Sequence, residues 1–329
     1  MASEQMKLSL IIPTYNRRAV LQQVLMSLVD QQPTGTGQPV PEFEVIVVDD
    51  GSTDDTLAML AQAVLPFPLR VIQARHTGPA HARNLGVAAA QAPLLLFLDS
   101  DLLAGPQLVA AHYEAHRVDP DDRIVHGPVI QVDTLDVTRA RQVKARLGDL
   151  SRAFFATGNA SLAKRHIEAA GGFDEEFSLY GWEDLEMGER LRRLGLKAVW
   201  VAEAQGYHYK PPLQTKDLPS RCRREEERAH NAILFYRKHP SRRVRWMIPL
   251  HPVTFGIERL ISFGGWPERR WARHWLAHLE VHGPRWLWRF GSWAVIQHAY
   301  YQALRREWRH FRTQLPPGGQ ARKAEGAES

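Results

Sequence analysis

Two carboxylates follow the most apolar run of the sequence. Residues 94–98 read Leu-Leu-Leu-Phe-Leu, and Asp99 and Asp101 come directly after them. An apolar run without alternation predicts a strand buried on both faces, as in the middle of a parallel sheet. Ligands of open α/β sheets bind at the carboxyl ends of the strands, where paired carboxylates can hold a hard divalent cation. A solvated Asp-Ser-Asp turn explains the same residues, so the rest of the chain must decide between the two interpretations.

Other side chains able to do chemistry lie further along the chain. A second apolar run, residues 43–48, also ends on two carboxylates, Asp49 and Asp50. Glu183 and Asp184 stand together after a Gly-Trp pair, and a positioned carboxylate can accept the proton of an attacking hydroxyl. His208 lies between two tyrosines after a strand-like stretch, and a neutral imidazole is a good ligand for Mn²⁺. Each group also has a plain alternative. Asp49 and Asp50 could simply precede a turn, Glu183 and Asp184 could be the acidic first turn of a helix, and His208 could be an ordinary histidine.

The elements that would position these groups alternate between strand and helix. In the first hundred residues we predict strands at 8–12, 43–48, 69–72 and 94–98, and helices at 18–31, after the Gly51–Asp54 turn with Ser52 or Thr53 as N-cap, and from Gly78 to about Gln91. This order favours an α/β fold with a parallel sheet covered by helices on both faces. Further on we expect a strand at 124–130 interrupted at Gly127-Pro128, a helix over 135–150, a short strand or loop at 157–162, a helix after Glu183, and strands at 198–202 and 207–209.

Six motifs carry a resemblance to a known family. They are IIPTYNR, VIVVDDGSTDDT, GPAHARNLG, FLDSD, GGFDEEF and YGWEDLEMGERLRRLG. In this order, over about residues 6–212, they resemble the motifs of family 2 glycosyltransferases. The Gly-Trp-Glu-Asp segment followed by His208 is also similar to the carboxyl-terminal part of galactosyltransferases and N-acetylgalactosaminyltransferases. The resemblance implies the GT-A fold: a central, mostly parallel sheet flanked by helices, here with a mainly helical C-terminal extension.

The resemblance also implies a reaction. It would be an inverting, metal-dependent transfer of a hexosyl or N-acetylhexosaminyl group from a nucleotide sugar, most simply UDP-linked, to a hydroxyl of a glycan, polysaccharide or lipid-linked acceptor. Asp101, His208 and Asp99 would hold Mn²⁺ or Mg²⁺, and the donor would be bound by Pro13, Tyr15, Arg17, Asp50, Arg83 and Asp99. Asp184 would be the general base, with Glu183 beside it on the acceptor and Trp182 stacked on the acceptor sugar. Plain roles remain open for three of these residues: packing for Tyr15, a position before a turn for Asp50, and a surface ion pair for Arg83. We expect Glu186 and Glu189 on a solvated helical face.

Two other functions fit part of these observations. A nucleotidyltransferase also uses a metal and a nucleotide on a parallel sheet, but it predicts a phosphate loop rich in glycine and lysine after the first strand. The residues there, Pro13-Thr14-Tyr15-Asn16-Arg17, do not supply one. A catalytically silent scaffold that binds sugar or lipid would not need both Asp99–Asp101 and Glu183-Asp184.

Charge and tryptophan divide the chain. Residues 1–209 contain 19 Lys and Arg against 26 Asp and Glu, whereas residues 210–329 contain 23 against 10, and eight of the ten tryptophans follow residue 240. We therefore predict a catalytic domain at 1–212, a basic, Trp-rich helical region at 213–315 and a disordered tail at 316–329. Arginine with tryptophan on helices is typical of a segment at an anionic membrane surface, although packing on the core or on a second subunit explains it equally. Nucleic acid is not expected, because the catalytic motifs already account for the site.

The remaining bulk properties bear on the compartment. The single cysteine, Cys222, excludes an intrachain disulfide and fits a reducing compartment. No apolar run approaches the ~20 residues that cross a bilayer, and the first residues lack the apolar stretch of a signal peptide. We therefore expect a cytoplasmic protein, peripheral at the inner face of the membrane if the basic region binds lipid.

Overall fold

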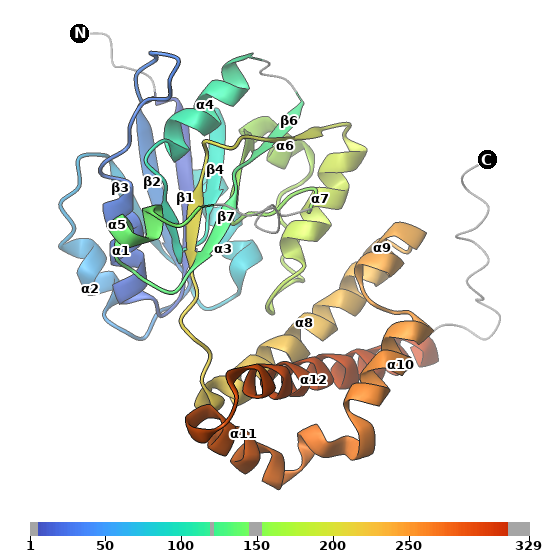
Figure 1. Ribbon diagram of the computed structural model, residues 1–329. Helices are drawn as coiled ribbons and strands as arrows, with labels where there is room; N and C mark the ends of the chain where they lie inside the picture. Colours follow the sequence, from blue (N-terminus) through green and yellow to red (C-terminus); the bar gives the residue numbers. More distant parts are fainter. Residues whose placement is uncertain (1–5, 119–121, 145–152, 315–329) are drawn as a thin grey trace. The chain divides into compact units, whose positions relative to one another are not determined.

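The computed structural model describes residues 6–118, 122–144 and 153–314 (Figure 1). The chain forms two compact units. The first contains Met1–Ser178 and Glu183–Pro212, and the second contains Leu179–Trp182 and Leu213–Ser329. The chain passes from the first unit to the second after residue 212, and residues 179–182 also belong with the second unit.

A seven-stranded sheet forms the centre of the first unit (Figure 1). Its strands, in spatial order, are β3 (Leu69–Gln73), β2 (Phe43–Asp49), β1 (Leu8–Thr14), β4 (Leu94–Leu98), β8 (Asn159–Ala163), β6 (Arg123–His126) and β9 (Lys197–Trp200). The pairs β3–β2, β2–β1, β1–β4 and β6–β9 are parallel, and β8 is antiparallel to both of its neighbours. The four strands predicted for the first hundred residues are thus confirmed, as is the mostly parallel sheet.

A three-stranded sheet lies beside the carboxyl end of β4. It contains β5 (Leu102–Ala104), β10 (Gly206–Tyr209) and β7 (Val129–Val132), with β10 in the middle. β10 is antiparallel to β5, and His208 pairs with Leu102. Because Leu102 directly follows Asp101, this register brings His208 to the end of the central strand. The break predicted at Gly127-Pro128 is confirmed, since it separates β6 from β7.

Helices cover the sheet of the first unit. They are α1 (Arg18–Ser27), α2 (Thr56–Ala61), α3 (Pro79–Ala89), α4 (Leu108–Val118), α5 (Val137–Arg141), α6 (Lys164–Ala169) and α7 (Glu183–Arg193). Neighbouring residues of a strand point to opposite faces. Accordingly Leu10 and Ile12 pack in the cluster that includes α1, whereas Ile11 packs in the cluster that includes α3. Gly86 of α3 is required there, because a Cβ would lie 2.4 Å from Ile11 Cγ2.

Two local predictions were wrong. The helix expected over 135–150 is only the short α5 within the described residues, and residues 145–152 lie outside them. The N-cap expected at Ser52 or Thr53 is also absent, because α2 starts later, at Thr56, whose N–H donates to the Asp54 carboxylate over 3.0 Å. Ser52 accepts instead from the Asn16 N–H, over 2.8 Å.

The second unit is helical. It contains the 3₁₀ turn η2 (Thr215–Asp217), α8 (Leu218–Lys238), α9 (Arg242–Met247), α10 (Pro252–Ile261), the 3₁₀ segment η3 (Phe263–Glu268), α11 (Arg270–His282) and α12 (Arg285–Gln314). The long helices α8 and α12 pack along each other (Figure 1). No helix among the described residues combines the length and apolar character needed to cross a membrane. The tail predicted at 316–329 lies outside the described residues.

Candidate active site

The loops after β1 and β2 hold each other at the carboxyl edge of the sheet. Asn16 has a left-handed backbone (φ +50°), which asparagine tolerates better than most residues. Its side-chain oxygen accepts from the N–H groups of Thr53 (2.7 Å) and Asp54 (3.2 Å). These bonds fix the position of Tyr15 and Arg17 on either side of Asn16.

The predicted nucleoside residues Tyr15 and Asp50 meet a histidine that the sequence did not single out. The Tyr15 ring is 41% exposed and stacks on the ring of His76, with centroids 4.1 Å apart. Asp50 accepts from the N–H groups of Thr77 (2.9 Å) and Gly78 (3.0 Å), and His76 Nδ1 lies 3.2 Å from Asp50 Oδ2. Tyr15 is therefore not a buried packing residue, and Asp50 does more than precede a turn. Pro13 lies within β1 opposite Val48 and shows no polar role.

The carboxylates at the end of β4 meet His208. One ligand atom from each of Asp99, Asp101 and His208 lies within 4.8 Å of the other two. His208 Nε2 is 3.0 Å from Asp101 Oδ1, and Arg17 donates to the other Asp101 oxygen. Gly158 keeps space beside Asp99, because a Cβ there would lie 2.9 Å from Asp99 Oδ2. Two carboxylates and an imidazole form a donor set that suits Mn²⁺ or Mg²⁺.

The two carboxylates of this cluster differ in acidity. Burial raises the pKa of Asp101, but the His208 hydrogen bond and the Arg17 charge lower it more strongly, to about 2. Burial, reinforced by the charge of Asp101, raises the pKa of Asp99, against the opposing charge of Arg83. Asp101 is therefore ionised at neutral pH, as a metal ligand must be.

Arg83 is buried between two carboxylates. Its Nη1 donates to Glu183 Oε1 over 2.9 Å, and its Nη2 lies 3.8 Å from Asp99 Oδ1. Glu183 is itself buried, so the partner of Arg83 is not the surface carboxylate of the plain alternative. Arg83 thus joins the β4 carboxylates to the start of α7.

Glu183 and Asp184 form the first turn of α7. Asp184 Oδ1 accepts from the Leu185 N–H over 2.8 Å. Burial raises the pKa of Asp184, the charge of Glu183 raises it further and Arg83 opposes them, with the result at about 7. A carboxylate that exchanges its proton near neutral pH has the acidity of a general base. Glu183 Oε2 is buried without a hydrogen-bond partner among the described residues, so it retains an unused acceptor.

Trp182 and the acidic residues of α7 differ from expectation. Trp182 has a left-handed backbone (φ +76°) and is 5% exposed, with its ring 5.8 Å from that of Phe235 and the Arg228 guanidinium 5.7 Å from it. This geometry favours packing in the second unit over the predicted stacking on an acceptor sugar. The solvated face predicted for Glu186 and Glu189 is wrong: both are buried, because Arg190 and Arg192 from the same helix pair with them at 2.6 and 2.7 Å.

A buried polar layer lies next to the cluster of Asp99, Asp101 and His208. His112 Nε2 lies 2.9 Å from Asn159 Oδ1, and His112 Nδ1 lies 2.8 Å from Ser161 Oγ. Asn159 also donates to the Ala204 carbonyl over 2.8 Å, just before β10. The chain next to Gly158 and the approach to His208 are thereby tied together. The only sequence signal for this layer is a set of polar residues within apolar elements.

Comparison with protein families agrees with this geometry. The profile described as Glycosyl transferase family 2 matches residues 9–173, and that described as Glycosyl transferase family group 2 matches residues 96–313. The chain belongs to glycosyl transferase family 2. The resemblance of the motifs to family 2 glycosyltransferases is therefore confirmed, and the segment that the family 2 profile matches includes β1 to β8.

Curated relatives share part of this family 2 chain. Hyaluronan synthase of Pasteurella multocida is 31% identical over 246 residues, which are 62% of this chain and 25% of the relative. Validoxylamine A glucosyltransferase of Streptomyces hygroscopicus subsp. jinggangensis (strain 5008) is 31% identical over 278 residues, which are 71% of this chain and 61% of the relative. The family 2 chain thus spans a quarter of the first relative and about three fifths of the second.

Solved structures confirm the GT-A fold for this family 2 chain. S. aureus TarS 1-349 in complex with UDP has a TM-score of 0.53 and 20% identity, covering 95% of this chain and 93% of that one. The mannosyltransferase PcManGT from Pyrobaculum calidifontis, in complex with GDP-Man and Mn²⁺, has a TM-score of 0.52 and 17% identity, covering 98% and 83%. Because both identities are 20% or lower, the likeness to these structures shows the fold alone.

Proposed function

We propose that the chain catalyses inverting, metal-dependent transfer of a hexosyl or N-acetylhexosaminyl group from a UDP-sugar to a hydroxyl of a glycan, polysaccharide or lipid-linked acceptor. One observation carries the proposal. A cluster of Asp99, Asp101 and His208 lies on one side of Arg83, and Asp184, with its raised pKa, follows Glu183 on the other. The arrangement offers a cation site and a base to the same reactants.

On the donor side, each residue has a task that its surroundings support. Asp101 and His208, with Asp99, would hold Mn²⁺ or Mg²⁺, which stabilises the charge of the leaving diphosphate. Arg17, beside Asp101, offers a guanidinium that suits phosphate oxygens. The exposed Tyr15 ring offers a face to the nucleobase, and the Asp50 carboxylate retains lone pairs for a uracil N–H.

On the acceptor side, Asp184 would take the proton of the attacking hydroxyl. Direct displacement by that hydroxyl inverts the anomeric centre and needs one base. Glu183 would orient the acceptor through Oε2, while its Oε1 remains bonded to Arg83. Arg83 opposes the rise in the pKa of Asp184, and so keeps a fraction of the base ionised at neutral pH.

The names of the relatives support the substrate classes. TarS has been solved with UDP and with UDP-GlcNAc, and PcManGT with GDP-Man. Hyaluronan synthase and chondroitin synthase are named for the polysaccharides that they make. These names support our proposal that the chain acts in polysaccharide or glycan biosynthesis.

A thermal-shift panel tests the proposal. UDP, GDP, UDP-sugars and GDP-mannose are added with and without Mn²⁺, since a ligand that binds only the folded protein raises its melting temperature. We expect the largest rise with a UDP-sugar plus Mn²⁺. The same rise without a divalent cation, or a larger one with GDP-mannose, would contradict the metal or the donor assignment. Release of UDP in the reaction, with no inorganic pyrophosphate, separates glycosyl transfer from nucleotidyl transfer.

A further inference from the structure

The second unit exposes large apolar side chains on α10. Val253, Ile257 and Leu260 are spaced i, i+4 and i+7, and all three are exposed. That spacing places them on one face of the helix. Leu260 is 77% exposed, and Phe263, at the start of η3, is 81% exposed. This face of α10 therefore does not belong to the core of the unit.

A second apolar row follows the same spacing on α12. Trp286, Phe290 and Trp293 lie at i, i+4 and i+7, and all three are exposed. The Phe290 and Trp293 rings are 5.9 Å apart. Several other tryptophans of the unit have packing roles: Trp266 and Trp275 contact each other at 5.8 Å, and Trp288 Nε1 donates to Thr215 Oγ1 over 3.0 Å. The exposed tryptophans of α12 thus differ from those that pack within the unit.

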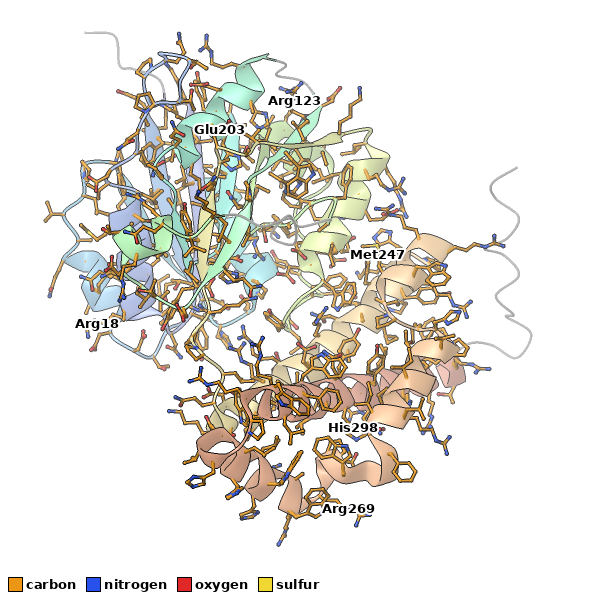
Figure 2. All side chains as sticks on the ribbon, viewed as in Figure 1. Arg18, Arg123, Glu203, Met247, Arg269 and His298 are labelled. Carbon is orange, nitrogen blue, oxygen red and sulfur yellow. The ribbon has the colours of Figure 1, made fainter. Side chains whose placement is uncertain are left out.

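The two rows belong to one surface. A cavity of about 100 Å³ lies between α10 and α12, and its lining includes Ile257, Ile261 and Trp293. Figure 2 shows the side chains of these helices, with His298 labelled on α12 and Arg269 after η3. We use the name apolar face for seven exposed side chains: Val253, Ile257, Leu260, Phe263, Trp286, Phe290 and Trp293.

The charge around the apolar face is of one sign. Residues 242–293 contain nine arginines, three glutamates, and no lysine or aspartate. Each glutamate is engaged: Glu258 is buried with His298 Nδ1 at 2.6 Å, Glu268 lies 2.9 Å from His298 Nε2, and Glu280 accepts from the Thr215 N–H over 3.1 Å. Between residues 259 and 289 all the arginines are exposed: Arg259, Arg269, Arg270, Arg273, Arg285 and Arg289.

We propose that the apolar face docks on the surface of an anionic lipid bilayer. Its seven side chains would enter the boundary between headgroups and acyl chains, while the arginines reach the lipid phosphates. A second copy placed face to face would bring arginine against arginine, which electrostatics disfavours. The proposal is independent of the reaction assigned to the first unit. It adds a partner that would hold the enzyme where lipid-linked acceptors are found.

Flotation of the full chain with vesicles tests the proposal. The vesicles are phosphatidylcholine alone or phosphatidylcholine with phosphatidylglycerol, at low and high salt. We expect flotation with the anionic vesicles and a decrease as salt screens the charges. The double variant Leu260→Ser/Phe263→Ser should bind at least tenfold more weakly, because two large apolar side chains no longer enter the interface. Arg269→Gln/Arg270→Gln should lose roughly fivefold for each arginine.

Matched controls make the result specific. Val64→Ser removes an apolar side chain that is 97% exposed in the first unit, and Arg139→Gln removes an exposed arginine of α5. Both should float like the wild type, and all variants should keep the wild-type UDP affinity. Failure of the folded wild type to float with anionic vesicles, or undiminished flotation of Leu260→Ser/Phe263→Ser, would overturn the proposal. A dimer that becomes a monomer only in this double variant, without lipid binding, would assign the face to a second copy.

Discussion

The two ends of the candidate site contain the same kind of side chain in opposite electrostatic surroundings. Arg17 and His208 keep the pKa of Asp101 at about 2, so that carboxylate stays charged. Burial and the neighbouring Glu183 raise the pKa of Asp184 to about 7. A permanently ionised group suits a bound cation, whereas a group that exchanges its proton near neutral pH suits proton transfer.

Arg83 is the residue common to both ends. It lies 2.9 Å from Glu183 and 3.8 Å from Asp99, and its charge lowers the pKa of Asp99 and of Asp184. The role of each carboxylate therefore follows from the balance between its burial and the charges placed beside it. If this comparison is right, removing the charge of Asp101 should mainly weaken metal-dependent UDP binding, whereas removing the charge of Asp184 should mainly lower kcat.

The largest effect is expected at the cation end. Asp101→Asn removes a charged ligand, and a metal contributes several kcal/mol to the stabilisation of a leaving group, so activity should fall about 10³-fold. UDP binding in Mn²⁺, measured by calorimetry, should weaken and lose its dependence on the metal. Asp133→Asn, at an exposed position of the same unit, is the control and should be silent. Undiminished metal-dependent UDP binding in Asp101→Asn would remove Asp101 from the cation site.

The next effect is expected at the base. Asp184→Asn should lower kcat about 10²-fold or more with little change in UDP affinity, because an amide cannot accept the proton. In the wild type, kcat/KM should rise with pH through about 7, as Asp184 loses its proton. Asp184→Asn should lack that limb between about pH 5.5 and 8.5. Lost UDP affinity with retained turnover would place Asp184 on the donor side instead.

Much of this arrangement could be predicted from the sequence. The runs at 43–48 and 94–98 predicted buried strands because a strand covered on both faces has no polar alternation. The bonds of Arg83 and His76 could not be predicted, since both depend on residues brought together by the fold: Glu183 for Arg83, and Tyr15 for His76. Tertiary contacts also override local capping preferences: Ser52 accepts from the Asn16 N–H, and the first N–H of α2, from Thr56, donates to Asp54.

Periodicity was a poor guide to burial on α7. Glu186 and Glu189 were expected on a solvated face, yet both are buried because arginines of the next turn neutralise them. Composition alone could not distinguish buried from exposed tryptophans after residue 240. The structure separates those that pack, such as Trp275 and Trp288, from exposed ones such as Trp286 and Trp293. Which face of a helix is covered depends on partners that are distant in the sequence.

The smallest effect is on stability, and its sign distinguishes the two ends. The pKa of Asp184 rises from the model-peptide value of 3.8 to about 7 on folding, so the folded protein binds more protons than the unfolded chain between those values. The contribution of protonated Asp184 to the free energy of unfolding is fully present below about pH 4 and is lost as pH rises through about 7. Asp184→Asn, which cannot ionise, should therefore be more stable than the wild type at pH 8, by about 1–2 kcal/mol after allowance for partial exposure.

The extra stability of Asp184→Asn over the wild type should shrink as pH falls to 5, because the wild-type Asp184 carboxyl is then mostly protonated. Urea titrations of both proteins at pH 5 and pH 8 measure this difference through the midpoint. Asp101→Asn should show the opposite sign, since the low pKa of Asp101 means that its ionised form stabilises the folded state at both pH values. Equal destabilisation by both substitutions at pH 8 would show that Asp184 is a paired structural carboxylate. The contrast between the two ends of the site would then not hold.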